Sequence, residues 1–325
     1  MIDVQRLRVL RAVAEHGSFN KAAGALLLTP SAVSQHIATL ERGLGHPVVV
    51  RGSRGITLTE PGRLLTEAAE SIFAELDRVR NAIERLSAPR PRLTVATFTS
   101  GGRHLLPAAL PRFVAAHPEV ELTVREAEPE AALPMVRDGA ADLALGYHFD
   151  EPLPVLPGVD WSPLMDDPLW VVLPPDHPHA GRDSIALAEL TDARWVLGCL
   201  RTEAYLRRYA QRSGFEIRIS ASTTDYFFAQ SLVAAGVGVS LVPQVALLSP
   251  LDAPRPGPAA PSGAPVAVRV EPPRPVRHLG LATARRRDAR PYLDTLTAAL
   301  RDAAKEPHTR ASPKSCCAPW SPRTA

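Results

Sequence analysis

The order of apolar and polar residues divides the chain into two parts with different periods. Up to about Leu86, apolar residues recur at the three- and four-residue spacing of one helix face. A proline-containing break follows at residues 88–92 (APRPR), and prolines end helices. From Leu93 onward, short β-rich runs such as LTVATF and ADLALGY alternate with helical stretches. This alternation is typical of an α/β domain built around a largely parallel sheet.

Three helices are predicted in the first 45 residues. The first covers residues 4–16 and stops at Gly17, and Ser18 is a candidate cap for the second. The third begins where Thr29 takes the N-cap position with Pro30 directly after it, which is a strong start signal. Its apolar positions form one buried stripe: Val33, Ile37, Leu40 and Leu44.

The opposite face of this third helix has the composition of a DNA-reading surface. It carries Ser31, Ser34, Gln35, Ala38 and Arg42. This mix of short hydroxyls and one amide suits a major groove, because a helix N-terminus favours phosphate and glutamine can form paired hydrogen bonds with adenine. The alternative is an ordinary solvated helix face without a partner.

Two short β runs after this helix favour the DNA-reading interpretation. Residues 48–51 and 56–59 flank a Gly-Ser-Arg-Gly turn, so a helix-turn-helix is followed by a two-stranded wing. Arg51 and Arg54 on this wing are placed to reach phosphates or a narrow minor groove. Residues 1–60 hold seven Lys and Arg against four acids. The predicted DNA-binding residues are Thr29, Pro30, Ser31, Ser34, Gln35, Arg42, Arg51 and Arg54.

This segment resembles the DNA-binding domain of the LysR-type transcriptional regulators. The matching residues are Gly17-Ser18-Phe19, Ala22-Ala23, Thr29-Pro30-Ser31-Ala32-Val33-Ser34, Ile37, Leu40-Glu41, Leu44-Gly45, Arg51, and Leu58-Thr59 with Gly62. Val48-Val49 departs from the Leu-Phe pair that is usual in the family. The resemblance implies a winged helix-turn-helix over residues 1–60 that binds double-stranded DNA.

A linker helix is predicted over residues 61–88. Its apolar residues are spaced alternately four and three apart, as in a coiled-coil seam: Leu65, Ala69, Ile72, Leu76, Val79, Ile83 and Leu86. The seam predicts pairing of two chains, which would place two recognition helices on two half-sites of a roughly palindromic operator. The alternative is a helix that packs on its own domain. The resemblance also implies dimerisation through this helix, with a homodimer or a homotetramer as the product.

The remainder, residues 92–304, is predicted to form two lobes around a cleft. Lobe I takes about 92–160 and 271–304, and lobe II takes about 161–270. Ligands bind outside the carboxyl ends of parallel strands. The segments ADLALG, LVAAGVGVSLVP and PRFVAAHPEVELTVRE resemble the LysR-type effector domain, which is similar to type 2 periplasmic binding proteins. This resemblance implies an effector site at Thr99, Ser100, Thr202 and Thr224, with Tyr147 and His148 as further candidates.

The predicted fold class is therefore α/β, with an N-terminal winged helix-turn-helix, a long linker helix and a two-lobed effector domain. The 325 residues carry a net charge of +3, which permits an anionic partner without requiring one. Three cysteines at positions 199, 316 and 317 give no disulfide framework or metal spacing. No signal peptide or membrane-spanning run is present in the sequence, so a cytoplasmic protein is expected. No cofactor is expected either. Residues 305–325 are expected to be a disordered tail, and the proline-rich segment 249–265 leaves the edge of lobe II undefined.

Two other classes of protein compete with a regulator. A solute-binding protein for transport would need an export signal, but the chain begins with a helix-turn-helix. An enzyme with a DNA-binding appendage would need a catalytic constellation, and the sequence holds no HExxH, GxSxG or P-loop motif. The sequence therefore predicts a non-enzymatic transcriptional regulator that responds to a small-molecule effector.

Overall fold

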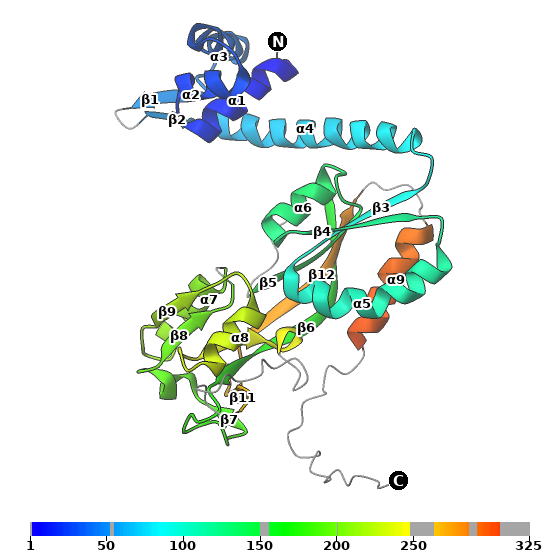
Figure 1. Ribbon diagram of the computed structural model, residues 1–325. Coiled ribbons are helices and arrows are strands. Elements are labelled where there is room, and N and C mark those ends of the chain that lie inside the picture. Colours follow the sequence, from blue (N-terminus) through cyan, green and yellow to red (C-terminus); the bar gives the residue numbers. More distant parts are fainter. Residues whose placement is uncertain are drawn as a thin grey trace. The chain divides into compact units, whose positions relative to one another are not determined.

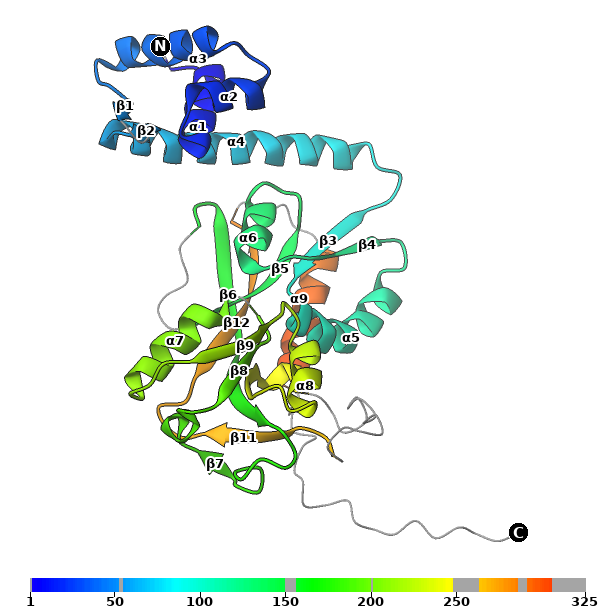
Figure 2. The same ribbon diagram turned by 60° about the vertical axis from the view of Figure 1, so that its left-hand side comes forward.

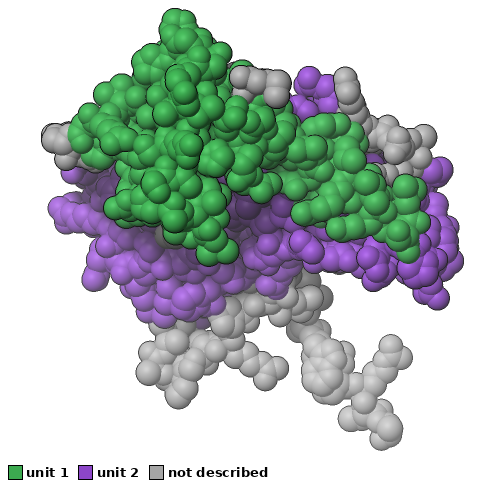
Figure 3. Space-filling view, turned by 90° about the horizontal axis from the view of Figure 1, so that it is seen from above, with its two compact units in different colours: residues 1–87, 137–140 green, residues 88–136, 141–325 purple. Residues whose placement is uncertain are grey.

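The computed structural model describes residues 2–52, 55–149, 156–199, 201–247, 263–285 and 291–305. The chain divides into two compact units (Figures 1 and 3). Unit 1 holds residues 1–87 with 137–140, and unit 2 holds residues 88–136 with 141–325. All but the first residue of the predicted tail (residues 305–325) lies outside the described residues, and Lys305 itself belongs to the last described helix. Most of the proline-rich segment predicted at residues 249–265 also lies outside them.

Unit 1 contains three short helices, a two-stranded wing and one long helix. Its elements are α1 (Val4–His16), α2 (Phe19–Leu26), α3 (Pro30–Leu44), β1 (Val49–Gly52), β2 (Gly55–Leu58) and α4 (Glu60–Leu86). The two wing strands are antiparallel, with Val49 opposite Leu58. The core of this unit is made by one face of each short helix together with Val48.

Local signals set the helix ends in unit 1. The Thr29 side chain accepts a hydrogen bond from the Ala32 N–H at 3.2 Å, which fixes the start of α3. Gly17 ends α1 in the left-handed conformation at φ 60°. Ser18 is the N-cap residue of α2, as expected. Its side chain, however, makes no cap hydrogen bond, so the expected side-chain cap is wrong. Its extended backbone alone leads into the helix.

Unit 2 alternates strands and helices in chain order. Its elements are β3 (Arg92–Thr97), α5 (Thr99–Ala116), β4 (Glu121–Glu126), α6 (Pro129–Arg137), β5 (Leu143–Phe149), β6 (Val159–Leu173), β7 (Ser184–Ile185), η1 (Leu187–Leu190), β8 (Arg194–Leu197), α7 (Thr202–Arg212), β9 (Arg218–Ser222), α8 (Tyr226–Ala234), β10 (Ser240–Pro243), η2 (Gln244–Ala246), β11 (Val266–Val270), β12 (Val276–Ala284) and α9 (Pro291–Lys305).

The long strand β6 runs through two lobes of unit 2 (Figure 2). Its first part, up to Pro168, pairs with β12, and the sheet of lobe I continues from β12 through β5 and β3 to β4 at the edge. Its last part, from Leu169, pairs with β10 and β11 in lobe II. The chain therefore passes between the lobes at the middle of β6, later than the boundary near residue 160 that the sequence suggested. It returns between β11 and β12.

Helices cover both faces of the lobe I sheet. Alternate strand residues such as Leu143 and Leu145 pack with α5 and α9, whereas Ala144 packs with α6 on the other face. Lobe II repeats this arrangement, with Val171 in the core that contains α7 and Val172 in the core that contains α8. The alternation follows from the two-residue period of a strand that is buried on both faces. The predicted α/β class and the two-lobed architecture are confirmed.

Candidate DNA-binding surface and interlobe pocket

The polar face of α3 is exposed on unit 1. Ser31, Gln35, Ala38 and Arg42 are exposed and Ser34 is partly exposed, whereas Val33, Ile37 and Leu40 are buried in the core. At the helix start, the hydroxyls of Thr29 and Ser31 lie within hydrogen-bond distance, 3.0 Å apart. Pro30 is exposed at the first helical position. A row of short polar groups with free bonding capacity thus runs along one side of the helix.

The two arginines that the structure describes on this surface are held differently. The Arg51 guanidinium lies 4.7 Å from the centre of the Phe19 ring and donates to the Ser34 hydroxyl at 3.5 Å. It therefore lies against the N-terminal half of α3. Arg42 donates back to Thr39 of its own helix at 3.0 Å. Arg54 falls outside the described residues.

The predicted seam of α4 divides into a covered part and an exposed part. Near the start of α4, Ala69 and Phe73 pack on Leu7 of α1, and Leu65 is partly buried beside them. The later members keep between 40% and 87% of their surface exposed: Ile72, Leu76, Val79, Ile83 and Leu86. Such a continuous apolar stripe on a helix is the kind of surface that a second helix covers.

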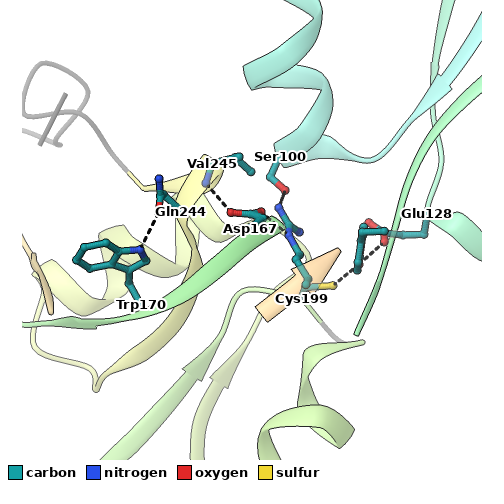
Figure 4. A network of polar contacts seen from close by, with 9 residues as sticks. Ser100, Glu128, Asp167, Trp170, Cys199, Gln244 and Val245 are labelled. Carbon is teal, nitrogen blue, oxygen red and sulfur yellow. Dashed lines mark hydrogen bonds and ion pairs between the residues drawn. The ribbon is translucent and has the colours of Figure 1, made fainter. Parts of the chain in front are cut away.

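A small pocket lies where the two lobes of unit 2 meet. Its lining comes from the start of α5, from β5 and β12, and from the segments that lead into α6, α7 and α8. The lining residues are Phe98, Thr99, Ser100, Glu128, Tyr147, Cys199, Thr224, Asp225, Tyr226 and Arg277. Side chains fill most of it, and the remaining space takes only a molecule of about the size of water. Figure 4 shows how several of these side chains bind one another.

Arg277 and Asp167 form a fully buried ion pair in this region. Arg277 on β12 stands directly opposite Asp167 on β6 in the strand register, and its Nε donates to the Asp167 carboxylate at 2.7 Å. Burial by itself lowers the pKa of Arg277, but the facing Asp167 carboxylate outweighs this and raises the pKa above its ordinary value. The guanidinium is therefore charged, and three rings pack against it at 4.8 to 5.9 Å: Phe98, Tyr147 and Tyr226.

A second set of contacts joins the lobes at the pocket rim. Tyr147 donates its hydroxyl proton to Glu128 at 2.8 Å, and its oxygen lies 3.6 Å from the Cys199 sulfur. Burial raises the pKa of Tyr147, so its hydroxyl is a neutral donor. From lobe II, Arg201 reaches Glu130 at 2.6 Å and Glu128 at 3.9 Å.

The six predicted effector residues do not all meet at this pocket. Thr99, Ser100, Tyr147 and Thr224 line it. Thr202 is buried behind it and donates its hydroxyl to the Cys199 carbonyl at 2.5 Å. His148 lies on β5 with its ring 5.1 Å from that of His278 and is not in the lining. The structure thus separates Thr202 and His148 from the pocket lining.

Sequence reasoning missed the charged pair at the pocket. Asp167 follows another acid, Asp166, and Arg277 precedes His278, so neither stands out in the sequence as a buried charge. Nothing in their spacing identifies them as partners, because the two residues are 110 positions apart. Tyr226 at the start of α8 was not among the predicted site residues, yet its side chain is buried against Gly198 and lines the pocket.

Among the described residues, no group of three or more His, Cys, Asp or Glu is arranged to hold a metal ion. No helix within the described ranges is both long and apolar enough to cross a membrane.

The chain combines a winged helix-turn-helix, a fold of DNA-binding proteins, with a two-lobed domain of the kind that binds small ligands between its lobes. This combination is typical of transcriptional regulators that respond to a ligand. Two family models match the chain: the bacterial regulatory helix-turn-helix protein of the LysR family over residues 4–63, and the LysR substrate binding domain over residues 87–305. The chain belongs to the LysR family of transcriptional regulators.

Individual relatives agree with this assignment. The chain is 30% identical over 312 residues to a probable hydrogen peroxide-inducible genes activator of Streptomyces viridosporus, covering 94% of this chain and 95% of the relative. It is 30% identical over 247 residues to the RuBisCO operon transcriptional regulator of Allochromatium vinosum, covering 74% and 79%. Among solved structures, an OxyR mutant of Corynebacterium glutamicum matches with 25% identity and a TM-score of 0.54, covering 93% and 91%.

Proposed function

We propose that this regulator reads operator DNA with the exposed face of α3 and changes its operator binding when a small molecule occupies the interlobe pocket. The observation that carries the first part is the exposed row of short polar groups on α3. Thr29, Pro30 and Ser31 contact the DNA sugar-phosphate backbone and so set the position of the helix in the groove. Ser34 and Gln35 contact the edges of the bases. Arg42, Arg51 and Arg54 add phosphate contacts, which carry affinity for any sequence.

Base choice and general affinity should be separable by mutation. Gln35→Ala removes the amide that can pair with adenine, so discrimination at one position of each half-site falls by about 1–3 kcal/mol. Arg51→Ala removes a phosphate contact, so binding to all sequences weakens and its salt dependence becomes shallower. Titration of a library of operator variants at several salt concentrations measures both. Identical behaviour of the two variants would contradict this division of roles.

The exposed stripe of α4 supports a homodimer that binds a roughly palindromic operator. In the proposed dimer, the exposed stripe packs against the same stripe of a second chain through Ile72, Leu76, Val79, Ile83 and Leu86. Leu65 lies at the other end of the seam, where α4 is covered by its own unit. Ile83→Asp places a charge in that seam, so sedimentation should show a shift to monomer at micromolar concentration. Glu84→Gln, on the neighbouring polar side of the same helix turn, is the matched control and should leave the mass unchanged.

Effector binding is proposed at the pocket lined by Thr99, Ser100, Tyr147 and Thr224. Because this pocket is nearly filled by its own side chains, a ligand larger than water has to separate contacts between the lobes. Its differential affinity for the two lobe arrangements then sets how far DNA binding shifts. Footprints taken with and without a molecule that binds the protein should differ in extent or in DNA bending. Identical footprints would remove effector control from the proposal.

A second candidate stimulus is peroxide, favoured by the position of Cys199 in the pocket beside the Tyr147 hydroxyl. The Streptomyces relative is named for induction by hydrogen peroxide. In this scheme the Cys199 thiol takes one oxygen from hydrogen peroxide to give a sulfenic acid, and the other oxygen leaves as water together with the thiol proton. Dimedone labelling followed by mass spectrometry detects the sulfenic acid. Labelling of the wild type but not of Cys199→Ser supports this candidate, and absence of labelling excludes it.

The enzyme alternative has a direct test as well. Purified protein should leave a panel of candidate metabolites unchanged, because the pocket cation Arg277 is already paired with Asp167 and burial keeps the Tyr147 hydroxyl neutral by raising its pKa. Turnover of any of them would replace the regulator proposal by an enzyme with a DNA-binding appendage.

A further inference from the structure

Arg277 is the centre of a chain of buried polar contacts that reaches both lobes. Its NH2 group donates to the Ser100 hydroxyl at 2.9 Å, and its Nε donates to one oxygen of Asp167 at 2.7 Å. The other Asp167 oxygen accepts from the backbone N–H of Val245 at 3.1 Å. Figure 4 labels Ser100, Asp167 and Val245 along this chain of contacts.

The ends of this chain belong to different parts of unit 2. Ser100 stands in the first turn of α5, above the lobe I sheet, and lines the pocket. Val245 belongs to η2 in lobe II, directly after β10. Arg277 and Asp167 lie between them on β12 and β6, at the level where the chain passes from one lobe to the other. The contacts therefore connect a pocket residue to the backbone of the opposite lobe.

Burial makes each link sensitive to the others. Arg277 and Asp167 have no exposed surface, and Ser100 keeps only 3%. A buried charge that loses a hydrogen-bond partner cannot recover one from water, so the group must move or remain unpaired. Ser100 thus has two roles: it lines the pocket, and its hydroxyl accepts a hydrogen bond from the Arg277 guanidinium.

We propose that Ser100, Arg277 and Asp167 act as a polar relay that transmits occupation of the pocket to η2 in lobe II. The relay rests on the proposed function of the pocket as the effector site. A ligand that draws the Ser100 hydroxyl toward itself lengthens the bond to Arg277. The guanidinium then shifts relative to Asp167, and the Asp167 bond to the Val245 N–H weakens. Ser100 is a positioning residue in this scheme, in addition to any contact with the ligand.

The rim contact between Arg201 and Glu130 is a weaker route between the lobes. The Glu130 side chain keeps 63% of its surface exposed and that of Arg201 keeps 31%. Exposed ion pairs exchange readily with water and salt. Coupling through the rim would therefore be lost at high ionic strength, whereas coupling through the buried relay would persist.

Hydrogen exchange of the Val245 amide tests the relay without an effector. In the full-length protein, Ser100→Ala removes the acceptor for Arg277, so Val245 should exchange about tenfold faster, also at high salt. Ser100→Thr keeps a hydroxyl and should restore most of the protection. Ser240→Ala is the matched control, because this buried serine in lobe II bonds to the Val196 carbonyl and lies outside the relay. It should leave Val245 exchange unchanged.

Two outcomes would overturn the relay. One is unchanged Val245 exchange in Ser100→Ala. The other is equal acceleration in Ser240→Ala. A measurement on the wild type covers the case in which Ser100→Ala does not fold: the Arg277 Nε–H and the Val245 N–H share Asp167, so each should be protected by the same factor relative to its own intrinsic exchange rate. Different protection factors would contradict the relay. These results are independent of DNA binding, so they are distinct from a failure of the proposed function.

Discussion

The face of α3 and the interlobe pocket contain similar side chains in opposite states. On α3, hydroxyls and an amide are exposed and have bonding capacity left over. In the pocket, Ser100, Tyr147, Asp167 and Arg277 are buried and already bind one another. The surface proposed to meet DNA is therefore formed in advance. The pocket must exchange internal bonds for bonds to a ligand, which makes it suited to a change of state.

The strongest way to sharpen this comparison is to break the buried ion pair. Arg277→Met leaves the Asp167 carboxylate buried without its charge partner, so the free energy of unfolding of unit 2 should fall by about 3–5 kcal/mol. Urea denaturation measures this loss. Arg285→Met is the matched control. Arg285 directly follows β12 and pairs with Asp160 of β6 at 3.0 Å, but both side chains are more than half exposed. Its loss should stay below about 1 kcal/mol.

A smaller loss is expected at the rim of the pocket. Tyr147→Phe removes the hydroxyl that donates to Glu128, so stability should fall by about 1.5 kcal/mol, the low end for a bond to a charged acceptor. Gln35→Ala removes an exposed amide of α3 and should change stability by less than about 0.5 kcal/mol. If the two variants lose equal stability, the contrast between a paired pocket and an unpaired DNA surface is wrong.

The smallest effect concerns the two caps of the helix-turn-helix. Thr29→Ala removes a side-chain acceptor for the Ala32 N–H and should lower the stability of unit 1 by about 1 kcal/mol. Ser18→Ala should have less effect, because the structure shows no side-chain cap bond at Ser18. Thermal melts of the two variants in parallel measure the difference. Equal losses would show that Ser18 caps α2 after all.

Sequence reasoning worked best where the signals are local. The start of α3 is marked by Thr29-Pro30, and its buried stripe of Val33, Ile37 and Leu40 follows within three turns. Gly17 likewise lies directly at the end of α1. Spacing alone therefore defines these helices. The same reasoning misjudged Ser18, because a suitable residue at a helix start need not use its side chain.

The pocket could be predicted only in part, since it assembles from distant segments. Residues that directly follow strand β3, such as Thr99 and Ser100, are found from the rule that ligands bind at strand ends. The partner of Ser100 is Arg277, which lies 177 positions later and inside a strand. Only the register of β12 against β6 brings Arg277 to Asp167. That register depends on tertiary packing, which no single segment of sequence encodes.

The bare stripe along α4 has a consequence for gene dosage. In the proposed dimer, two chains joined along α4 present a matched pair of α3 helices that can contact both halves of an operator at once, whereas one chain presents a single α3. At concentrations below the dissociation constant for pairing, the amount of paired protein rises with the square of the total amount. Halving expression would then reduce operator occupancy about fourfold, so transcription of the target genes would respond steeply to the level of the regulator itself.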